Sequence, residues 1–163
     1  MELEEKIKLL RTKNSEVYNL KDEIFNLSKD VFEDWCKNVF EKYSKIESFG
    51  WNQYTPYFND GDTCTFSANT DYLSVNGEYV DDAEWMGATK VTNWGTYNRE
   101  TKVYDGRVEV PNENYDKVLE DATDEIRNFL QTFDDDFYIR KFGDHSEITV
   151  TKEGVEVDDY DHD

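Results

Sequence analysis

Apolar residues at the start of the chain recur at steps that alternate between four and three residues. The positions are Leu3, Ile7, Leu10, Asn14 and Val17, and Asn14 is their one polar member. This spacing is the heptad pattern of a coiled coil, in which each such residue faces a partner helix. A three-residue step after Val17 overwinds a coiled coil locally without ending it. The pattern then continues as Leu20, Ile24, Leu27 and Val31.

A single long helix is expected from the N-terminus to about Ser48, because no glycine or proline occurs before Gly50. Gly50 is expected to end the helix, since glycine readily takes the left-handed conformation found just past a helix end. The second half of the helix has a wider and more aromatic face, which suits packing on the rest of the protein. That face consists of Phe32, Trp35, Val39, Phe40 and Tyr43.

We interpret the first half of this helix as a homodimerisation segment. A buried asparagine on the seam lowers stability but fixes register and strand number, usually at two parallel strands. The alternative is that the helix folds back across the sheet of its own chain. A helix that covers a sheet usually has a broader apolar stripe, so the narrow seam favours a partner helix. The expected contact residues are Leu3, Ile7, Leu10, Asn14, Val17 and Ile24.

The middle of the chain has the pattern of short antiparallel strands joined by turns. Asn76-Gly77, between two short strand-like runs, is a strong signal for a two-residue hairpin. Another short strand pair is expected with its turn at Asp105-Gly106. These signals predict antiparallel hairpins rather than a parallel sheet.

One helix is expected after these hairpins. Asn112 is its predicted N-cap, and Asp134-Asp135-Asp136 is expected to end it. The apolar positions between them follow a 3.6-residue period. They are Tyr115, Val118, Leu119, Ala122, Ile126, Phe129, Leu130 and Phe133.

A final hairpin is expected near the C-terminus. Phe137–Phe142 and Glu147–Thr151 are its predicted strands, and a further turn precedes Val155 and Val157. Together the elements predict an α+β fold, with a long N-terminal coiled-coil helix followed by antiparallel β hairpins and one packed helix. We divide the chain into a helical arm, an acidic α+β body and a solvated acidic tail, at residues 1–48, 49–157 and 158–163.

The negative charge is concentrated in the second part of the chain. Residues 1–50 carry nine Lys/Arg and eleven Asp/Glu, whereas residues 51–163 carry nine Lys/Arg and twenty-seven Asp/Glu. Such a field repels nucleic acid and anionic membranes and attracts basic protein surfaces. We therefore expect a partner protein with a basic surface, and neither direct nucleic-acid binding nor membrane binding. The aromatic content of 15% indicates a folded body, because disordered acidic chains are poor in aromatic residues.

The compartment follows from what the sequence lacks. No stretch approaches the roughly 20 apolar residues of a membrane span, and the charged N-terminus has no signal-peptide core. Cys36 and Cys64 fit neither a metal-binding spacing nor a disulfide framework, so reduced thiols are the default. We therefore expect a cytoplasmic protein.

Motifs for catalysis are absent from the sequence. His145 and His162 are the two histidines, and neither lies in a recognisable nucleophile setting. The chain has no phosphate-binding glycine-rich loop, no HExxH and no CxxC. Carboxylate pairs carry no information here, because so many acids produce pairs by chance. We expect no catalytic residue, no metal and no cofactor.

Carboxylates gather on and just after the predicted second helix. A row of acids on a rigid surface can imitate the phosphates of duplex DNA, which carries one charge per about 1.7 Å. We interpret this row as the partner-binding face. The alternative is that the acids only keep the protein soluble. The row consists of Glu113, Asp116, Glu120, Asp121, Asp124, Glu125, Asp134, Asp135 and Asp136.

Aromatic residues beside polar groups offer a different kind of site. Trp51, Tyr54 and Tyr57 could stack a nucleobase or another planar ligand. The alternative, which we favour, is that these rings belong to the core.

Two segments carry a resemblance to a group of known proteins. The segment from Trp51 to Asp62, with the letters WNQYTPYFNDGD, resembles one found in small acidic proteins of tailed bacteriophages. The acidic end, Tyr160-Asp161-His162-Asp163, is similar to the end of the same proteins. The resemblance implies a phage accessory protein made in the cytoplasm of an infected bacterium, and it carries over no catalytic residue.

That origin gives the expected function a more specific form. Small acidic phage proteins often bind host proteins of defence or nucleic-acid handling, sometimes by DNA mimicry. We therefore expect a non-enzymatic homodimer that inhibits or modulates such a host protein. The alternatives are a sponge for a signalling nucleotide, which would use the aromatic residues, and a virion or assembly component, which would use the coiled coil.

Overall fold

A computed structural model describes residues 2–58, 60–80 and 87–162. The helices of this part of the chain are α1 (Leu3–Lys42), α2 (Lys117–Leu130) and α3 (Asp135–Phe142). Six strands form the main sheet: β1 (Ser48–Tyr54), β2 (Ser67–Ala68), β3 (Ser74–Val75), β4 (Glu78–Tyr79), β9 (Ser146–Thr151) and β10 (Gly154–Asp159). Four more form a separate hairpin arm: β5 (Lys90–Asn93), β6 (Thr96–Asn98), β7 (Val103–Asp105) and β8 (Val108–Pro111). The fold is α+β, as the sequence predicts.

The main sheet is antiparallel throughout, with the order β10-β9-β1-β3-β4 and with β2 beside β1. β1 pairs with β9 from Ser48 opposite Thr151 to Gln53 opposite Ser146, and the pairing of β9 with β10 is equally long. Gly50 lies in the middle of β1, where a Cβ would come within 2.4 Å of the carbonyl oxygen of Ile148. Glycine therefore permits the close approach of the two central strands.

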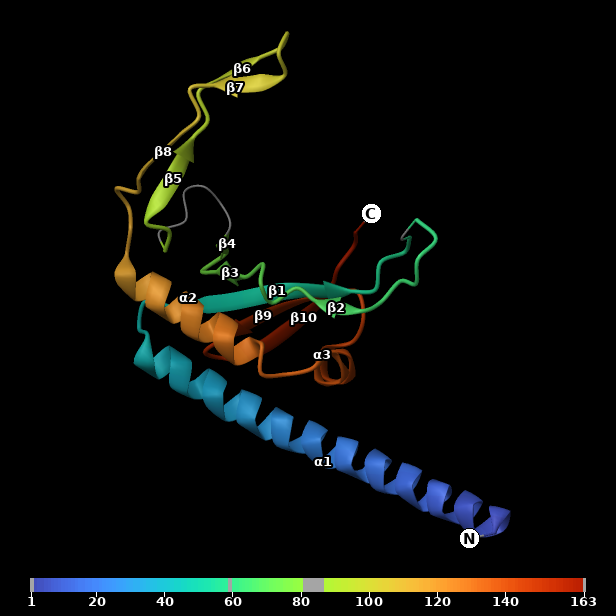
Figure 1. The fold of residues 1–163 in the computed structure, drawn as a ribbon. Helices are drawn as coiled ribbons and strands as arrows, with labels where there is room; N and C mark the ends of the chain where they lie inside the picture. The colour runs from blue at the N-terminus through green and yellow to red at the C-terminus, as the bar shows by residue number, and fades with distance from the viewer. Residues whose placement is uncertain (1, 59, 81–86, 163) are drawn as a thin grey trace.

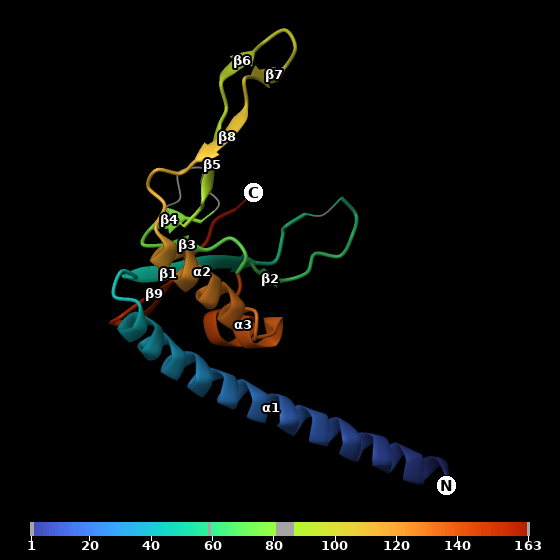
Figure 2. The same ribbon diagram turned by 60° about the vertical axis from the view of Figure 1, so that its left-hand side comes forward.

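The helices lie on one side of the main sheet (Figure 1). The second half of α1 runs beneath the sheet beside α2, and its first half projects away from the body (Figures 1 and 2). On the opposite side, β5–β8 and β6–β7 pair into a two-stranded arm that stands clear of the body (Figure 1). On this arm the Arg107 guanidinium lies 4.3 Å from the ring of Trp94, and the rings of Tyr97 and Tyr104 are 5.0 Å apart.

The core is built around Phe32, which is completely buried. Its ring centroid lies 6.4 Å from that of Trp51 on β1 and 5.6 Å from that of Phe142 at the end of α3. Three further rings surround it: Phe129 of α2 at 6.4 Å, Phe133 of the α2–α3 connection at 6.0 Å and Phe137 of α3 at 5.8 Å. Phe32 thus joins α1 to the sheet and to both shorter helices.

The boundaries of the first two helices differ from the sequence prediction. α1 ends at Lys42, before Gly50 is reached, and Gly50 serves the sheet instead. α2 begins at Lys117, because the Asp116 side chain accepts a hydrogen bond from the backbone N–H of Val118 at 2.9 Å and acts as the N-cap. Asn112, the predicted cap, lies outside this helix.

The third helix replaces a predicted strand. Residues 135–142 form α3, and Asp134 caps it by accepting the backbone N–H of Phe137 at 2.9 Å. The three aspartates that were expected to end α2 therefore begin α3, where the positive helix end favours carboxylates. The buried residues Phe137, Tyr138 and Phe142 share one helix face, whereas a strand would divide them between two sides.

The predicted acidic tail is also corrected by the structure. Asp158 and Asp159 are the last residues of β10, and the backbone N–H of Tyr160 donates to the carbonyl of His145 at 2.7 Å. His162 is half-buried. Asp158 and Asp159 thus belong to the sheet edge, and Tyr160 continues the pairing with one more hydrogen bond. In the hairpin arm the turn lies at residues 99–102, not at Asp105-Gly106.

Replacing Phe32 by alanine is expected to lower the free energy of unfolding by about 3–5 kcal/mol, because it leaves a cavity where five aromatic rings converge. Urea denaturation followed by circular dichroism measures the change. Phe58→Ala is the matched control, since Phe58 is 77% exposed, and it should change stability by less than about 0.5 kcal/mol. Similar losses for both variants would contradict the central role of Phe32.

Candidate interaction surfaces

Five of the six predicted seam residues, Leu3 to Val17, lie on a part of α1 without polar or ring contacts to the described body, whereas Ile24 lies beside Phe137 of α3. No hydrogen bond, ion pair or ring contact joins residues 3–21 to the described chain beyond α1 and its cap Glu2. The first links are Asp22, whose Oδ1 lies 2.9 Å from Arg140 Nη2, and Phe25, whose ring packs on Phe137. The alternative that the whole helix folds back across its own sheet is therefore wrong for this segment.

The seam residues are open to solvent. Leu3 is 72% exposed, Leu10 61% and Val17 55%. Ile7, Asn14 and Ile24 are exposed as well. Apolar residues repeated at coiled-coil spacing along an isolated helix are a surface that another helix can cover.

The predicted acidic row is largely occupied by contacts within the chain. Glu125 accepts Lys42 Nζ at 2.5 Å and the Tyr43 hydroxyl at 2.7 Å. Asp116 pairs with Lys45 in addition to capping α2. The hydrogen bond from Lys42, followed by that from Tyr43, lowers the pKa of the Glu125 carboxyl. These contacts hold the start of α2 against the end of α1.

Most other acids of the row have a partner a few residues away in the sequence. Asp121 binds Lys117 at 2.8 Å, and Asp124 lies 3.3 Å from Arg127. The remaining contacts are the Tyr115 hydroxyl on Glu120, the α3 cap by Asp134, and Arg140 at 3.4 Å from Asp136. Glu113 and Asp135 are the members for which the described chain shows no ion pair or side-chain hydrogen bond. A row neutralised in this way is a poor imitation of unpaired phosphates.

Strand β1 separates two of the predicted stacking residues. Trp51 is 2% exposed, and its ring packs against Tyr138 and Phe142. Successive residues of a strand point to opposite sides of the sheet, so Trp51 and Tyr54 lie on opposite sides. Trp51 therefore belongs to the core and not to a site with Tyr54 and Tyr57.

Tyr54 and Tyr57 instead stack on the two histidines of the chain. The ring centroid of His162 lies 3.9 Å from that of Tyr54 and 4.5 Å from that of Tyr57. Tyr57 also stacks on His145 at 4.8 Å. Nδ1 of His145 and Nε2 of His162 are 2.9 Å apart, so one ring donates a hydrogen bond to the other. We call these four residues the ring cluster.

Asp144 holds the loop that carries His145. Its carboxylate accepts the backbone N–H and the hydroxyl of Thr55, both at 2.7 Å, and the backbone N–H of His145 at 2.8 Å. Burial opposes ionisation of the Asp144 carboxyl, but the hydrogen bonds from Thr55 and His145 outweigh it and lower its pKa. His145 takes a left-handed conformation with φ +51°, which turns its ring toward Tyr57.

The ring cluster is filled by the chain itself. A planar ligand between Tyr54 and Tyr57 would have to displace the His162 ring. Asp144 Oδ2 lies 3.8 Å from His145 Nε2, which is too long for the hydrogen bond of a charge-relay pair. Among the described residues, no group of three or more His, Cys, Asp or Glu side chains is arranged to hold a metal ion. Burial raises the pKa of the Cys36 thiol to about 12, so it is not a nucleophile at neutral pH.

The comparisons with known proteins add no identification. No family model, no curated protein and no solved structure matches this chain. The resemblance to phage proteins therefore stays a prediction. In the part of the chain that the structure describes, no helix is long and apolar enough to cross a membrane.

Sequence reasoning missed the acids of the last hairpin. Glu147 lies directly opposite Asp158, and Glu156 follows on the same side of β10. The signal was present, because a two-residue turn that pairs Thr151 with Gly154 sets this register by counting. The prediction of a solvated tail at residues 158–163 leaves this pairing out.

Replacing His162 by alanine should release the C-terminal segment from Tyr54 and Tyr57. Aromatic pairs contribute about 0.5–1.5 kcal/mol each, so the loss of unfolding free energy should be about 1 kcal/mol. The direct measurement is the NMR shift of the Tyr57 ring protons, which ring currents from His162 displace. Asp161→Ala is the control, because Asp161 is exposed. Unchanged Tyr57 shifts in the His162 variant would contradict the stacking.

Proposed function

We propose that the protein is a non-enzymatic binding protein that self-associates through the first half of α1 and presents two acidic bodies to a partner with a basic surface. The observation that carries the proposal is the exposed heptad seam on a helix segment without contact to the body. A helix of 40 residues is about 60 Å long. A helix that packs on nothing is only marginally stable in water, because helices in proteins gain most of their stability from packing against other elements. A second copy supplies that packing.

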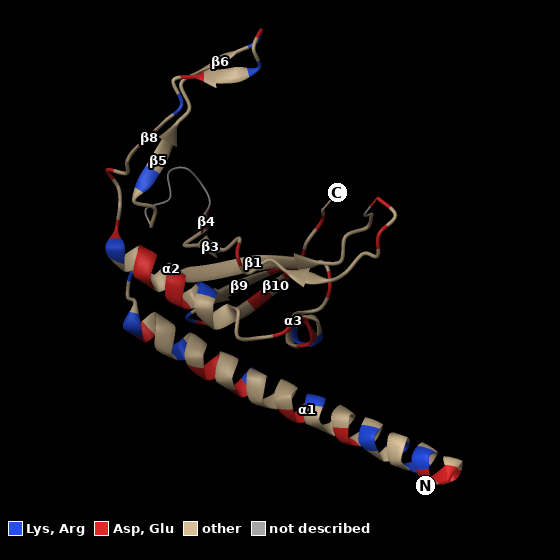
Figure 3. Ribbon diagram, in the orientation of Figure 1, with Lys and Arg blue, Asp and Glu red and all other residues tan. Residues whose placement is uncertain are grey.

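The mode of self-association that fits the seam is a parallel pair. Asn14 occupies the same seam position as Ile7, and two asparagines facing each other satisfy their polar groups only in one register. The flanks of the first half of α1 carry mixed charges (Figure 3), so two copies do not repel each other strongly. In a parallel pair both acidic bodies lie at the same end, on the C-terminal side of the seam.

The acidic body supports the second half of the proposal. Residues 51–163 carry an excess of eighteen acids over basic residues, and such a field accelerates encounters with basic surfaces at low salt. In its narrower form, which rests on the phage resemblance, the partner is a host protein of defence or nucleic-acid handling. The nucleotide-sponge alternative loses its support, because Trp51 lies in the core and His162 fills the space between Tyr54 and Tyr57. An assembly component would use the same exposed helix.

Replacing Leu10 by aspartate should convert the dimer to a monomer, because it puts a carboxylate into the apolar seam of each helix. Light scattering after size-exclusion chromatography at micromolar concentrations gives the mass. Leu9→Asp is the matched control, since Leu9 is also exposed but lies off the seam, and it should leave the dimer intact. Deletion of residues 1–20 should also give a folded monomer, as contacts with the body begin at Asp22. A monomeric intact chain would refute self-association.

Capture of a partner from bacterial lysate should weaken steeply as salt rises, because the screening length falls from about 10 Å at 0.1 M to about 3 Å at 1 M. Parallel pull-downs at the two salt concentrations measure this. Capture should survive charge reversal at Glu120, Asp121 and Asp124, since these acids already have partners on α2 or just before it. Abolished capture would instead establish the acidic row as the binding face.

A further inference from the structure

Strand β10 is an open edge of the main sheet. It pairs with β9 on one side and with no strand of the described chain on the other (Figure 1). All six of its residues are exposed. Natural proteins usually protect such an edge with a proline, a bulge, charged side chains or a covering loop. β10 contains no proline, and its pairing with β9 is continuous from Gly154 to Asp159. Its charged residues, Glu156, Asp158 and Asp159, are all acidic, so they oppose an acidic strand and attract a basic one.

The register shows which main-chain groups face outward. Tyr160 donates its N–H inward, to the carbonyl of His145. Hydrogen-bonded and non-hydrogen-bonded pairs alternate in an antiparallel ladder, so the pairs of Asp158 and Glu156 with β9 are also bonded inward. The N–H and C=O groups of Val155, Val157 and Asp159 therefore point to the open edge, where an added strand would bind them.

The two sides of β10 have different chemistry. Val155 and Val157 lie in register with Val150 and Ile148 and so point to the helix side of the sheet, yet they are 40% and 47% exposed. Beside Val155 a groove of about 310 Å³ opens between the second half of α1 and the β9–β10 turn. Its apolar lining comes from Phe32, Cys36, Phe40, Val150 and Val155.

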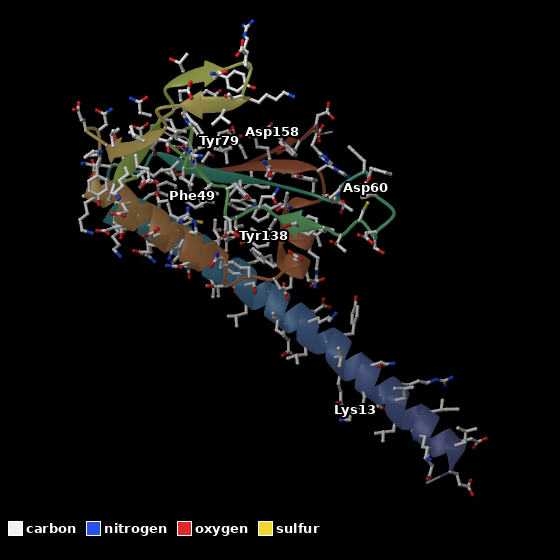
Figure 4. All side chains as sticks on the ribbon, turned by 45° about the horizontal axis from the view of Figure 1, so that its top comes forward. Lys13, Phe49, Asp60, Tyr79, Tyr138 and Asp158 are labelled. Atoms are coloured by element: carbon white, nitrogen blue, oxygen red, sulfur yellow. The ribbon has the colours of Figure 1, made fainter. Side chains whose placement is uncertain are left out.

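The opposite side of β10 carries carboxylates without counter-charges (Figure 4, Asp158). Asp158 lies directly opposite Glu147, and Glu156 is the next residue of the strand on this side. None of the three has an ion pair or a side-chain hydrogen bond within the described chain. Like charges directly opposite each other destabilise a strand pair, and a cationic side chain from a partner would relieve that repulsion.

A second copy of β10 is a poor occupant of this edge. An antiparallel pair of β10 strands would place Glu156 and Asp158 beside the same acids of the other copy. We propose that β10 is the docking edge for an extended basic segment of the partner, in which apolar residues alternate with lysine or arginine. The segment pairs as an added strand with the main-chain groups of Val155, Val157 and Asp159. Its apolar side chains point toward the groove. Its lysine or arginine side chains bind Glu147, Glu156 and Asp158. This deepens the proposed function, since it names the surface and the partner chemistry.

Short synthetic peptides test the proposal without a known partner. The probe is an end-blocked peptide that alternates valine with lysine, titrated against the full chain and measured by calorimetry. One control has the same composition with its valines and lysines in separate blocks. Another carries N-methyl groups along one edge, which removes its main-chain donors. Both controls should bind about tenfold more weakly, since each lost hydrogen bond or misplaced side chain weakens binding severalfold.

Two matched sets of charge reversals distinguish binding of the probe at β10 from its general attraction to the net negative charge. Reversal to lysine at Glu147, Glu156 and Asp158 should weaken the probe about tenfold or more. The same reversal at Glu120, Asp121 and Asp124 changes the net charge equally and should leave the affinity within about twofold. Equal losses for the two sets, or equal binding of the N-methylated probe, would reduce the effect to bulk charge and overturn the proposal.

Val157→Pro tests the edge itself. The N–H of Val157 points outward, so proline removes a donor for the added strand without breaking a bond to β9. A folded variant that still binds the probe at full strength would overturn the proposal. If the proline variant does not fold, the N-methylated probe and the two sets of charge reversals still test the docking proposal.

The same peptide titrations on the Leu10→Asp variant test whether binding of the probe at β10 depends on self-association. The monomeric variant should bind the probe as the intact protein does. A self-association that Val157→Pro abolishes and Leu10→Asp leaves intact would identify a second copy as the occupant of the edge, and would overturn the basic-segment proposal.

Discussion

The arrangement of the molecule depends on how Phe32 of α1 packs against the sheet and the two shorter helices. Its ring meets Trp51 of β1, Phe129 of α2 and Phe142 of α3. Because α1 is one continuous helix, this packing also fixes the direction in which its first half leaves the body. The core residues and the seam residues therefore lie at the two ends of one rigid helix. A change in the packing of Phe32 would change the direction in which the seam points.

The carboxylates of the chain divide into two kinds by what surrounds them. Asp116 and Glu125 bind Lys45 and Lys42, and they fasten α2 to the end of α1. Exposed ion pairs of this type add little stability each, but they fix geometry and neutralise charge locally. The acids of β9 and β10 have no such partners. Net charge alone does not distinguish these two groups, whereas the contacts do.

The sequence predicted what depends on periodicity and missed what depends on pairing across the chain. The 3.6-residue stripe correctly predicts α2, and the strand predicted at Glu147–Thr151 is β9, which begins one residue earlier. The strand predicted at Phe137–Phe142 was wrong because a short apolar run fits either period, and the cap by Asp134 decides it. The ring cluster was beyond sequence reasoning, since His145 and His162 meet only when β10 returns along β9.

The pairing of β1 with β9 has a consequence for how the protein is made. Ser48 must find Thr151 across most of the chain length, and contacts so distant in sequence close slowly. While the ribosome is still translating the segment between them, β1 has only the short strands β2 and β3 beside it, and most of the sheet that covers α1 is missing. The nascent chain therefore carries a partly uncovered helix and strand until β9 has been made. The acidic composition makes neighbouring nascent chains repel each other, which opposes their aggregation before the sheet is complete.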